Sequence, residues 1–140
     1  MKKYKTGIIG CGRIGSLLEE DPLRGKPCTH AGGFSALPAS HLSAGCDIDT
    51  DRLEKFGKRW NVTQLYSDYQ DMLNKESLDI VCIATWTPFH AKMTLKAADA
   101  GVKGIFCEKP IATNLKQARD MVRVCQEKNI SLIINHERRW

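Results

Sequence analysis

The feature that most constrains this chain is a glycine-rich turn that joins a short apolar run to a helical pattern. The turn is Gly10-Cys11-Gly12-Arg13-Ile14-Gly15, and it directly follows Thr6-Gly7-Ile8-Ile9. A strand, this glycine spacing and a helix together are the context of a dinucleotide-binding turn. Gly10 permits the tight turn, Gly12 lets a pyrophosphate approach the backbone, and Gly15 lets the helix pack closely. An ordinary glycine-rich turn is the alternative, but the context favours nucleotide binding.

Strand and helix patterns alternate along the whole chain. Strands are expected at 5–9, 41–47, 64–66, 79–84, 102–107 and 131–134. Helices are expected at 13–20, 51–60 (capped by Asp49 or Thr50), from Ser67 or Asp68 to about 74, 88–100, and 115–128. Repeated strand–helix units predict an α/β fold, a doubly wound and mostly parallel sheet in the order 3-2-1-4-5-6. The segment 21–40, rich in proline and glycine, interrupts this pattern as a long loop with a short helix near 30–37.

Length, charge and cysteine usage limit the classes of protein. The chain has 140 residues, as expected for one domain, and a net charge of +5 from scattered Lys and Arg residues. We therefore expect no nucleic-acid partner, and the absence of an apolar run of about 20 residues predicts no membrane span. Six cysteines without metal-ligand spacing predict free thiols, no metal and a cytoplasmic location. Cys28 and His30 are close in sequence, but two ligands alone do not make a metal site.

Asp47 ends the second predicted strand. A carboxylate at that position accepts hydrogen bonds from the adenosine ribose and repels a 2′-phosphate, so it favours NAD over NADP. The segment 21–40 explains why Asp47 lies farther from the glycines than about 20 residues. Asp49 is the competing candidate, although its position before the next helix favours a capping role. Arg52 lies nearby and would suit a 2′-phosphate, which keeps NADP as the less favoured cofactor.

Glu108-Lys109-Pro110 follows the fifth predicted strand. In a doubly wound fold, ligands bind at the carboxyl ends of the strands. A lysine placed there can act as an acid or base, and Pro110 restricts the backbone before it. Taken alone, this tripeptide is more typical of a surface turn.

These motifs together resemble the N-terminal half of the Gfo/Idh/MocA oxidoreductases. The matching segments are 7–15, 45–49, 79–85, 88–90 and 104–110, and the resemblance covers essentially all 140 residues. It implies that Lys109 assists proton transfer from a substrate hydroxyl, that Glu108 supports the cofactor, and that Thr85 and the following residues line its cleft. It also implies a sugar or polyol substrate. Residues 1–140 would be the dinucleotide-binding domain, without the second domain that binds substrate. An oligomer would form through that second domain, whose sheet is the family's usual dimer surface.

Three positions need separate interpretation. Trp86 stands where the family commonly has proline, and it either covers the cofactor or packs beside Phe89. His90 is interpreted as a helix residue that hydrogen-bonds near the cleft rather than as a base. The segment 135–140 resembles the family's path toward the second domain, or is a frayed end. The complete set of expected cofactor-binding residues is Gly10, Gly12, Arg13, Ile14, Gly15, Asp47, Ile48, Thr85, Trp86, His90, Glu108 and Lys109.

Three functions compete. The first is an NAD-dependent oxidoreductase, with hydride transfer between the nicotinamide and a sugar or polyol carbon. The second is a non-catalytic NAD-binding or sensing module that needs a partner chain. The third is a different two-domain dehydrogenase, such as an amino-acid-pathway reductase. The position of Glu108-Lys109-Pro110 after the fifth strand argues against the third.

Overall fold

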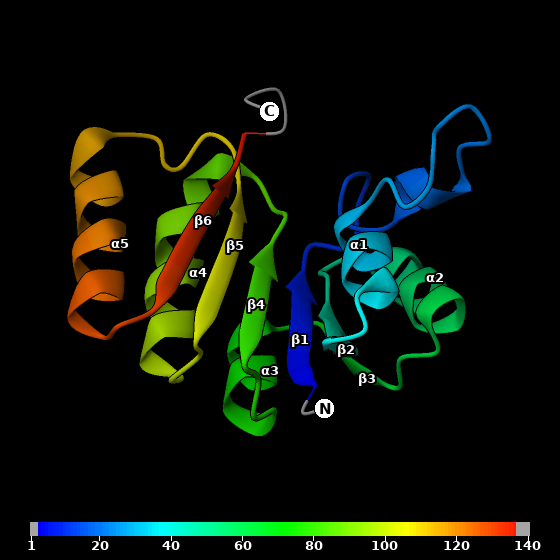
Figure 1. The fold of residues 1–140 in the computed structure, drawn as a ribbon, viewed down its shortest axis with the longest axis horizontal. Coiled ribbons are helices and arrows are strands. Elements are labelled where there is room, and N and C mark those ends of the chain that lie inside the picture. The colour runs from blue at the N-terminus through cyan, green and yellow to red at the C-terminus, as the bar shows by residue number, and fades with distance from the viewer. Residues whose placement is uncertain (1–2, 137–140) are drawn as a thin grey trace.

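Six parallel strands form one sheet in the order β3-β2-β1-β4-β5-β6, as Figure 1 shows. This computed structural model describes residues 3–136. The strand order is the doubly wound order predicted from the sequence. The strands are β1 (Tyr4–Ile9), β2 (Ser40–Cys46), β3 (Gln64–Tyr66), β4 (Ile80–Ile83), β5 (Gly104–Glu108) and β6 (Ser131–Asn135).

The helices begin at the caps that the sequence offers. Asp49, Asp68 and Asn114 each accept a hydrogen bond from a backbone N–H of the first helical turn, which selects Asp49 over Thr50 and Asp68 over Ser67 as caps. Gly101 (φ 80°) and Asn129 (φ 54°) follow the ends of two helices in the left-handed region. The helices are α1 (His30–Ala36), α2 (Thr50–Trp60), α3 (Tyr69–Lys75), α4 (Thr87–Asp99) and α5 (Leu115–Glu127).

Helices cover both faces of the sheet, which explains its continuous apolar strands. Ile8 and Cys82 belong to the core cluster under α1 and α2, whereas Ile9, Val81 and Ile83 belong to the cluster under α3, α4 and α5. All of these side chains are at most 2% exposed. The alternation of Ile8 with Ile9 follows the two-residue period of a strand, so β1 supplies side chains to both layers.

The expected helix at 13–20 is wrong. Residues 13–16 form a turn and Leu17–Glu20 a short 3₁₀ helix. The reason lies in the backbone hydrogen bonds, because the N–H of His30 donates to the carbonyl of Ile14, and that of Ala31 to Gly15, each at 3.0 Å. The first N–H groups of α1 thus bind the carbonyls that residues 18 and 19 would use in a continuous helix. Residues 16–29, between Gly15 and His30, therefore form an excursion from the domain. Figure 1 shows this excursion at the same edge of the sheet as the carboxyl end of β6.

Side chains fasten the excursion to the body of the domain. The Glu19 carboxylate accepts hydrogen bonds from the Thr29 hydroxyl at 2.6 Å and from the Cys28 N–H at 3.2 Å. From α2, the Trp60 indole N–H donates to the Ser16 hydroxyl at 2.9 Å. The excursion between Gly15 and His30 therefore has defined partners at both of its ends.

Gly15→Ala should destabilise the fold. A Cβ at Gly15 would collide with the carbonyl oxygen of Gly10, and backbone cannot yield as a flexible side chain can. We expect the free energy of unfolding to fall by about 1–3 kcal/mol, the typical cost of overpacking. Gly33→Ala in α1 is the matched control, because a Cβ there has nothing within 4 Å. Urea unfolding measures both, and equal stability of the two variants would contradict the close packing at Gly15.

Candidate dinucleotide-binding site

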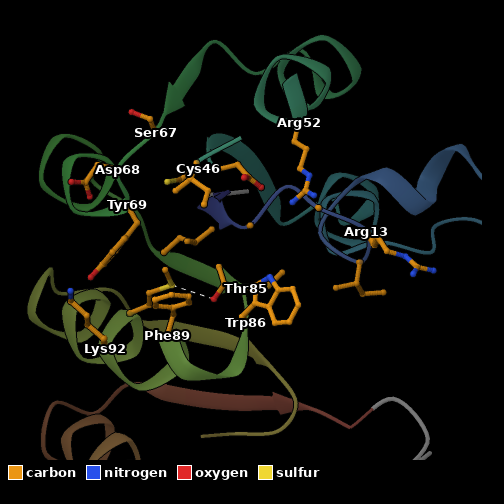
Figure 2. A pocket seen from close by; sticks show the side chains of 18 of the residues that line it. Arg13, Cys46, Arg52, Ser67, Asp68, Tyr69, Thr85, Trp86, Phe89 and Lys92 are labelled. Atoms are coloured by element: carbon orange, nitrogen blue, oxygen red, sulfur yellow. Dashed lines mark hydrogen bonds between the residues drawn. The ribbon is translucent and has the colours of Figure 1, made fainter. Parts of the chain in front are cut away.

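A cavity of about 810 Å³ lies at the carboxyl edge of the sheet, over the ends of β1, β2, β3 and β4. Its size is in the range of a small-molecule or cofactor site. The strand order reverses between β1 and β4, where ligands bind in doubly wound folds. Figure 2 shows side chains from α2, α3, α4 and the turn after β1 around it. It is lined by Ile9, Gly10, Gly12, Arg13, Ile14, Leu17, Cys46, Asp47, Ile48, Arg52, Ser67, Asp68, Tyr69, Gln70, Ala84, Thr85, Trp86, Thr87, Phe89, Lys92 and Met93.

The glycine turn presents bare backbone to this cavity. Gly10 has a φ of 99°, and a Cβ on it would meet the carbonyl oxygen of Ala84 at 2.5 Å. A Cβ on Gly12 would extend into open space, with the Arg52 Nη1 as its nearest neighbour at 3.7 Å. Within residues 3–136, no backbone N–H from Gly12 to Gly15 donates a hydrogen bond. Unpaired N–H groups beside a bare glycine form a cradle suited to an anionic group such as a pyrophosphate.

Asp47 fixes the turn to the end of β2. Its Oδ2 accepts the N–H of Cys11 at 2.8 Å and its Oδ1 accepts the N–H of Asp49 at 2.9 Å, although the side chain is largely buried. Each carboxylate oxygen retains a lone pair for another donor. Arg52 forms an ion pair with Asp49, 3.4 Å from Nε to Oδ2. Figure 2 shows Arg52 extending from α2 toward the turn, whereas Arg13 points outward.

The wall opposite α2 comes from β4 and α4. The Thr85 hydroxyl donates to the Met93 sulfur at 3.3 Å, drawn as the dashed line in Figure 2. Trp86 is 81% exposed and Phe89 is 51% exposed, while both line the cavity. The indole is therefore largely exposed where it lines the cavity. It stands at the cavity with its ring free to contact a ligand.

Glu108 lies at the centre of a buried hydrogen-bond network outside the cavity. Its Oε1 is 2.7 Å from the His30 Nε2 and accepts the Asn135 amide N–H at 2.8 Å. Its Oε2 accepts the Lys109 N–H at 3.2 Å. Burial by itself raises the pKa of Glu108, but the hydrogen bonds from His30 and Asn135 outweigh burial and lower that pKa below its ordinary value. Lys109, which follows, is exposed.

The expected site residues fall into two groups. The cavity brings together Gly10, Gly12, Arg13, Ile14, Asp47, Ile48, Thr85 and Trp86. Its described lining does not include the other four. Gly15 packs against the turn, and Glu108 and Lys109 lie at the end of β5. His90 is fully buried behind the wall, with its ring nitrogens 2.9 Å from the carbonyl oxygens of Thr85 and Pro110.

Sequence reasoning overlooked part of the lining and one partner of Glu108. Residues 67–70 follow β3, so the rule that ligands gather at strand ends could have found them. The exposed Lys92 of α4 lines the cavity, and it lies one helical turn after Pro88, the residue at which the sequence predicts this helix to begin. The sequence places His30 close to Cys28, whereas its pairing with Glu108 across 78 positions of sequence has no local signal.

The thiols and helices of the described part offer no further kind of site. All six cysteines are free, and burial raises the pKa of the Cys46 and Cys107 thiols to about 12. Within residues 3–136, no group of three His, Cys, Asp or Glu side chains could hold a metal ion. No helix there has the length and apolar character to cross a membrane. The tail of the chain from 137 onward, including most of the segment expected to lead to a second domain, lies outside the described residues.

Comparison with known families matches this architecture. The sequence profile described as "Oxidoreductase family, NAD-binding Rossmann fold" (GFO_IDH_MocA) matches residues 4–136. The chain belongs to this family. The resemblance inferred from the sequence motifs is thereby confirmed, and the chain is an NAD-binding Rossmann domain.

Relatives with names and solved structures include dehydrogenases of sugars and cyclitols. D-Apiose dehydrogenase of Paraburkholderia graminis is 34% identical over 140 residues, which is all of this chain and 34% of the relative. The structure of myo-inositol 2-dehydrogenase from Lactobacillus plantarum has a TM-score of 0.84 and 30% identity, over 99% of this chain and 38% of that one. Scyllo-inositol dehydrogenase from Lactobacillus casei, with bound NAD(H) and scyllo-inositol, has a TM-score of 0.84 and 25% identity, over 99% and 37%. The chain thus spans little more than a third of the length of these relatives.

Glu108→Gln should destabilise the domain in a pH-dependent way. At about pH 7 we expect a loss of about 1.5–3 kcal/mol in the free energy of unfolding, the range for hydrogen bonds to charged groups. The pKa of Glu108 is lowered in the folded protein, so its contribution is present above the ordinary pKa and is lost as the pH falls through the lowered one. The difference from the unsubstituted domain should therefore shrink at about pH 3.

Urea unfolding at both pH values measures this difference. Glu54→Gln is the matched control, because Glu54 pairs with Lys58 on the exposed side of α2. We expect this control to change stability little at either pH. A loss in Glu108→Gln that is the same at both pH values would show that the charge of Glu108 contributes nothing.

Proposed function

We propose that this domain holds the cofactor of an NAD-dependent oxidoreductase that moves a hydride between the nicotinamide and a hydroxyl-bearing carbon of a sugar or polyol. The observation that carries the proposal is the placement of Lys109 at the end of β5, next to β4, whose following residues line the NAD cavity. The names of the relatives, which include dehydrogenases of D-apiose and inositol, support the substrate class.

The residues of the cavity fit NAD, whose nicotinamide accepts or donates the hydride when bound. The N–H groups of the glycine turn would hold the pyrophosphate, because they are unpaired and Gly12 leaves the space free. The remaining lone pairs of Asp47 would accept the adenosine ribose hydroxyls. Thr85 and Trp86, on the β4 side, would contact the other half, and the exposed indole would cover it.

Lys109 is proposed to exchange a proton with the substrate hydroxyl. Its exposed ammonium leaves it accessible at the sheet edge, while its backbone N–H is held by Glu108. Glu108 is itself held by His30 and Asn135, so the network orients the lysine without occupying its Nζ. Glu108 would therefore support the site indirectly.

The remaining parts of the proposal concern the whole protein. Residues 1–140 would act as the dinucleotide-binding domain, and the substrate and any oligomer contact would involve a further domain, because the relatives are about three times longer. The buried free thiols support a reducing, cytoplasmic location. Scattered cations support a small-molecule ligand rather than nucleic acid or a membrane.

A non-catalytic NAD-binding module is the second candidate. One observation favours it, namely that Lys109 is not among the residues that line the cavity. Binding of NAD without turnover by the whole protein would support the second candidate over the first.

The domain should bind NADH at least about tenfold more tightly than NADPH. Asp47 would repel the 2′-phosphate, and a tenfold ratio needs only about 1.4 kcal/mol. Calorimetric titration with both cofactors measures the ratio. Asp47→Asn should reduce it, with thermal melting as a check because Asp47 also holds two backbone N–H groups. A preference for NADPH that disappears in Arg52→Ala would instead assign the 2′-position to Arg52.

Gly12→Val should abolish most NADH binding and leave the fold intact. The branched side chain would enter the space reserved for the pyrophosphate, yet the nearest protein atom is 3.7 Å from the Cβ position. We expect the Kd to rise by about a hundredfold or more, equivalent to losing about 2.7 kcal/mol. Gly25→Val, in the excursion, is the matched control, because a Cβ there has no neighbour within 4 Å. Unchanged affinity in folded Gly12→Val would place the phosphates elsewhere.

Lys109→Ala should separate chemistry from binding. In a protein that joins this domain to its substrate domain, kcat should fall by about 10²–10⁴-fold, the usual contribution of a positioned acid or base. The Kd for NADH should change far less, because Lys109 does not line the cavity. Assays with a panel of sugars and polyols measure the rate, and Lys92→Ala tests a cavity lysine for comparison. Turnover by residues 1–140 alone would show that no second domain is needed.

A further inference from the structure

His90 is held between two backbone carbonyl groups. Its Nδ1 lies 2.9 Å from the Pro110 oxygen and its Nε2 lies 2.9 Å from the Thr85 oxygen, and the side chain is 0% exposed. Thr85 follows β4 and lines the NAD cavity, whereas Pro110 directly follows Lys109. His90, on the first turns of α4, therefore joins the cavity wall to the lysine turn.

Both contacts can be hydrogen bonds only if the ring carries two protons. A carbonyl oxygen can only accept a hydrogen bond, and a neutral imidazole has one N–H and one bare nitrogen. In a neutral ring, one nitrogen lone pair would face an oxygen lone pair at 2.9 Å with no water between them. In an imidazolium, both nitrogens donate, and each contact becomes a charge-assisted hydrogen bond.

We propose that His90 is a doubly protonated positioning residue that clamps the carbonyl groups of Thr85 and Pro110. Burial of the ring opposes a charge, and the two charge-assisted hydrogen bonds compensate for it. The charged side chains within two residues of His90, Thr85 or Pro110 along the chain are Lys92, Glu108 and Lys109. The carboxylate of Glu108 is already bonded by His30 and Asn135. The two carbonyl groups, and not that carboxylate, therefore stabilise the charged ring of His90.

The clamp connects the cavity wall at Thr85 with the turn that carries Lys109, which does not line the cavity. The Thr85 side chain faces the cavity and bonds to Met93, so fixing the Thr85 carbonyl fixes that wall. Fixing the Pro110 carbonyl restricts the turn that carries Lys109. His90 touches neither the cavity nor a reacting atom, and it acts through these two backbone groups. This connection rests on the proposed NAD site, whereas the protonation state does not.

The first experiment reads the ring directly in the unsubstituted chain. Long-range ¹H–¹⁵N correlation spectra distinguish protonated from bare imidazole nitrogens. They are recorded at about pH 7, which is close to the ordinary pKa of a histidine side chain. We expect both His90 nitrogens to be protonated, with slowly exchanging N–H signals that are assigned by through-bond correlation from the ring to the His90 backbone. The exposed His41 is the internal reference for an ordinary ring. One bare nitrogen on His90 would overturn the proposal.

The second experiment tests the positioning role with NADH as the probe. His90→Gln should weaken NADH binding by about tenfold, equivalent to 1.4 kcal/mol, because the two N–H groups of a Gln amide share one nitrogen and cannot replace two separate ring nitrogens. His41→Gln is the matched control and should bind NADH as the unsubstituted chain does. Equal affinity of the two variants, both folded by circular dichroism, would overturn the positioning role.

A third measurement remains decisive if His90→Gln does not fold. Saturating the unsubstituted chain with NADH should shift the His90 ring signals, because Thr85 lines the site, and should leave His41 unshifted. Unshifted His90 signals in the bound protein would overturn the positioning role. Failure of the unsubstituted chain to bind NADH at all would instead overturn the proposed function and would leave the protonation result standing.

Discussion

The cavity depends on one buried carboxylate. Asp47 accepts the N–H of Cys11 on one oxygen and that of Asp49 on the other, so it joins the turn after β1 to the start of α2. The neighbouring bond from the Gly10 N–H to the Cys46 carbonyl, 2.8 Å long, continues the same attachment. A bare glycine turn has little intrinsic order, because glycine loses the most conformational freedom on folding. Asp47 supplies that order, and it leaves the N–H groups of the following residues free for an anion.

Local signals account for the parts of the fold that the sequence predicts well. The strands, the caps at Asp49, Asp68 and Asn114, and the strand order all follow from apolar periodicity and capping chemistry within a few residues. The helix at 13–20 fails for a non-local reason. Its hydrogen-bond acceptors at Ile14 and Gly15 are taken by residues of α1, across an excursion that no pattern in 13–20 announces.

The residues of the candidate site also fall into those that local sequence rules predict and those that they do not. Residues at strand ends could be found, because parallel strands bring their carboxyl ends to one edge whatever their sequence. Pairs that cross the fold could not, since His30 meets Glu108 and His90 meets Pro110 only once the sheet has formed. Each histidine by itself has the sequence context of an ordinary helix residue. Their partners are set by register between elements and not by spacing along the chain.

The glycine turn and the turn of Lys109, to which we assign binding and chemistry, therefore depend on separate hydrogen-bond networks. The glycine turn and Asp47 are ordered by hydrogen bonds among β1, β2 and α2. The turn of Lys109 is ordered by Glu108 with His30 and Asn135, through α1 and β6. Helix α1 reaches both networks, because its first N–H groups bond to the glycine turn while the His30 side chain bonds to Glu108. The excursion that interrupts the predicted helix thus ends in α1, the element that connects the glycine turn to the turn of Lys109.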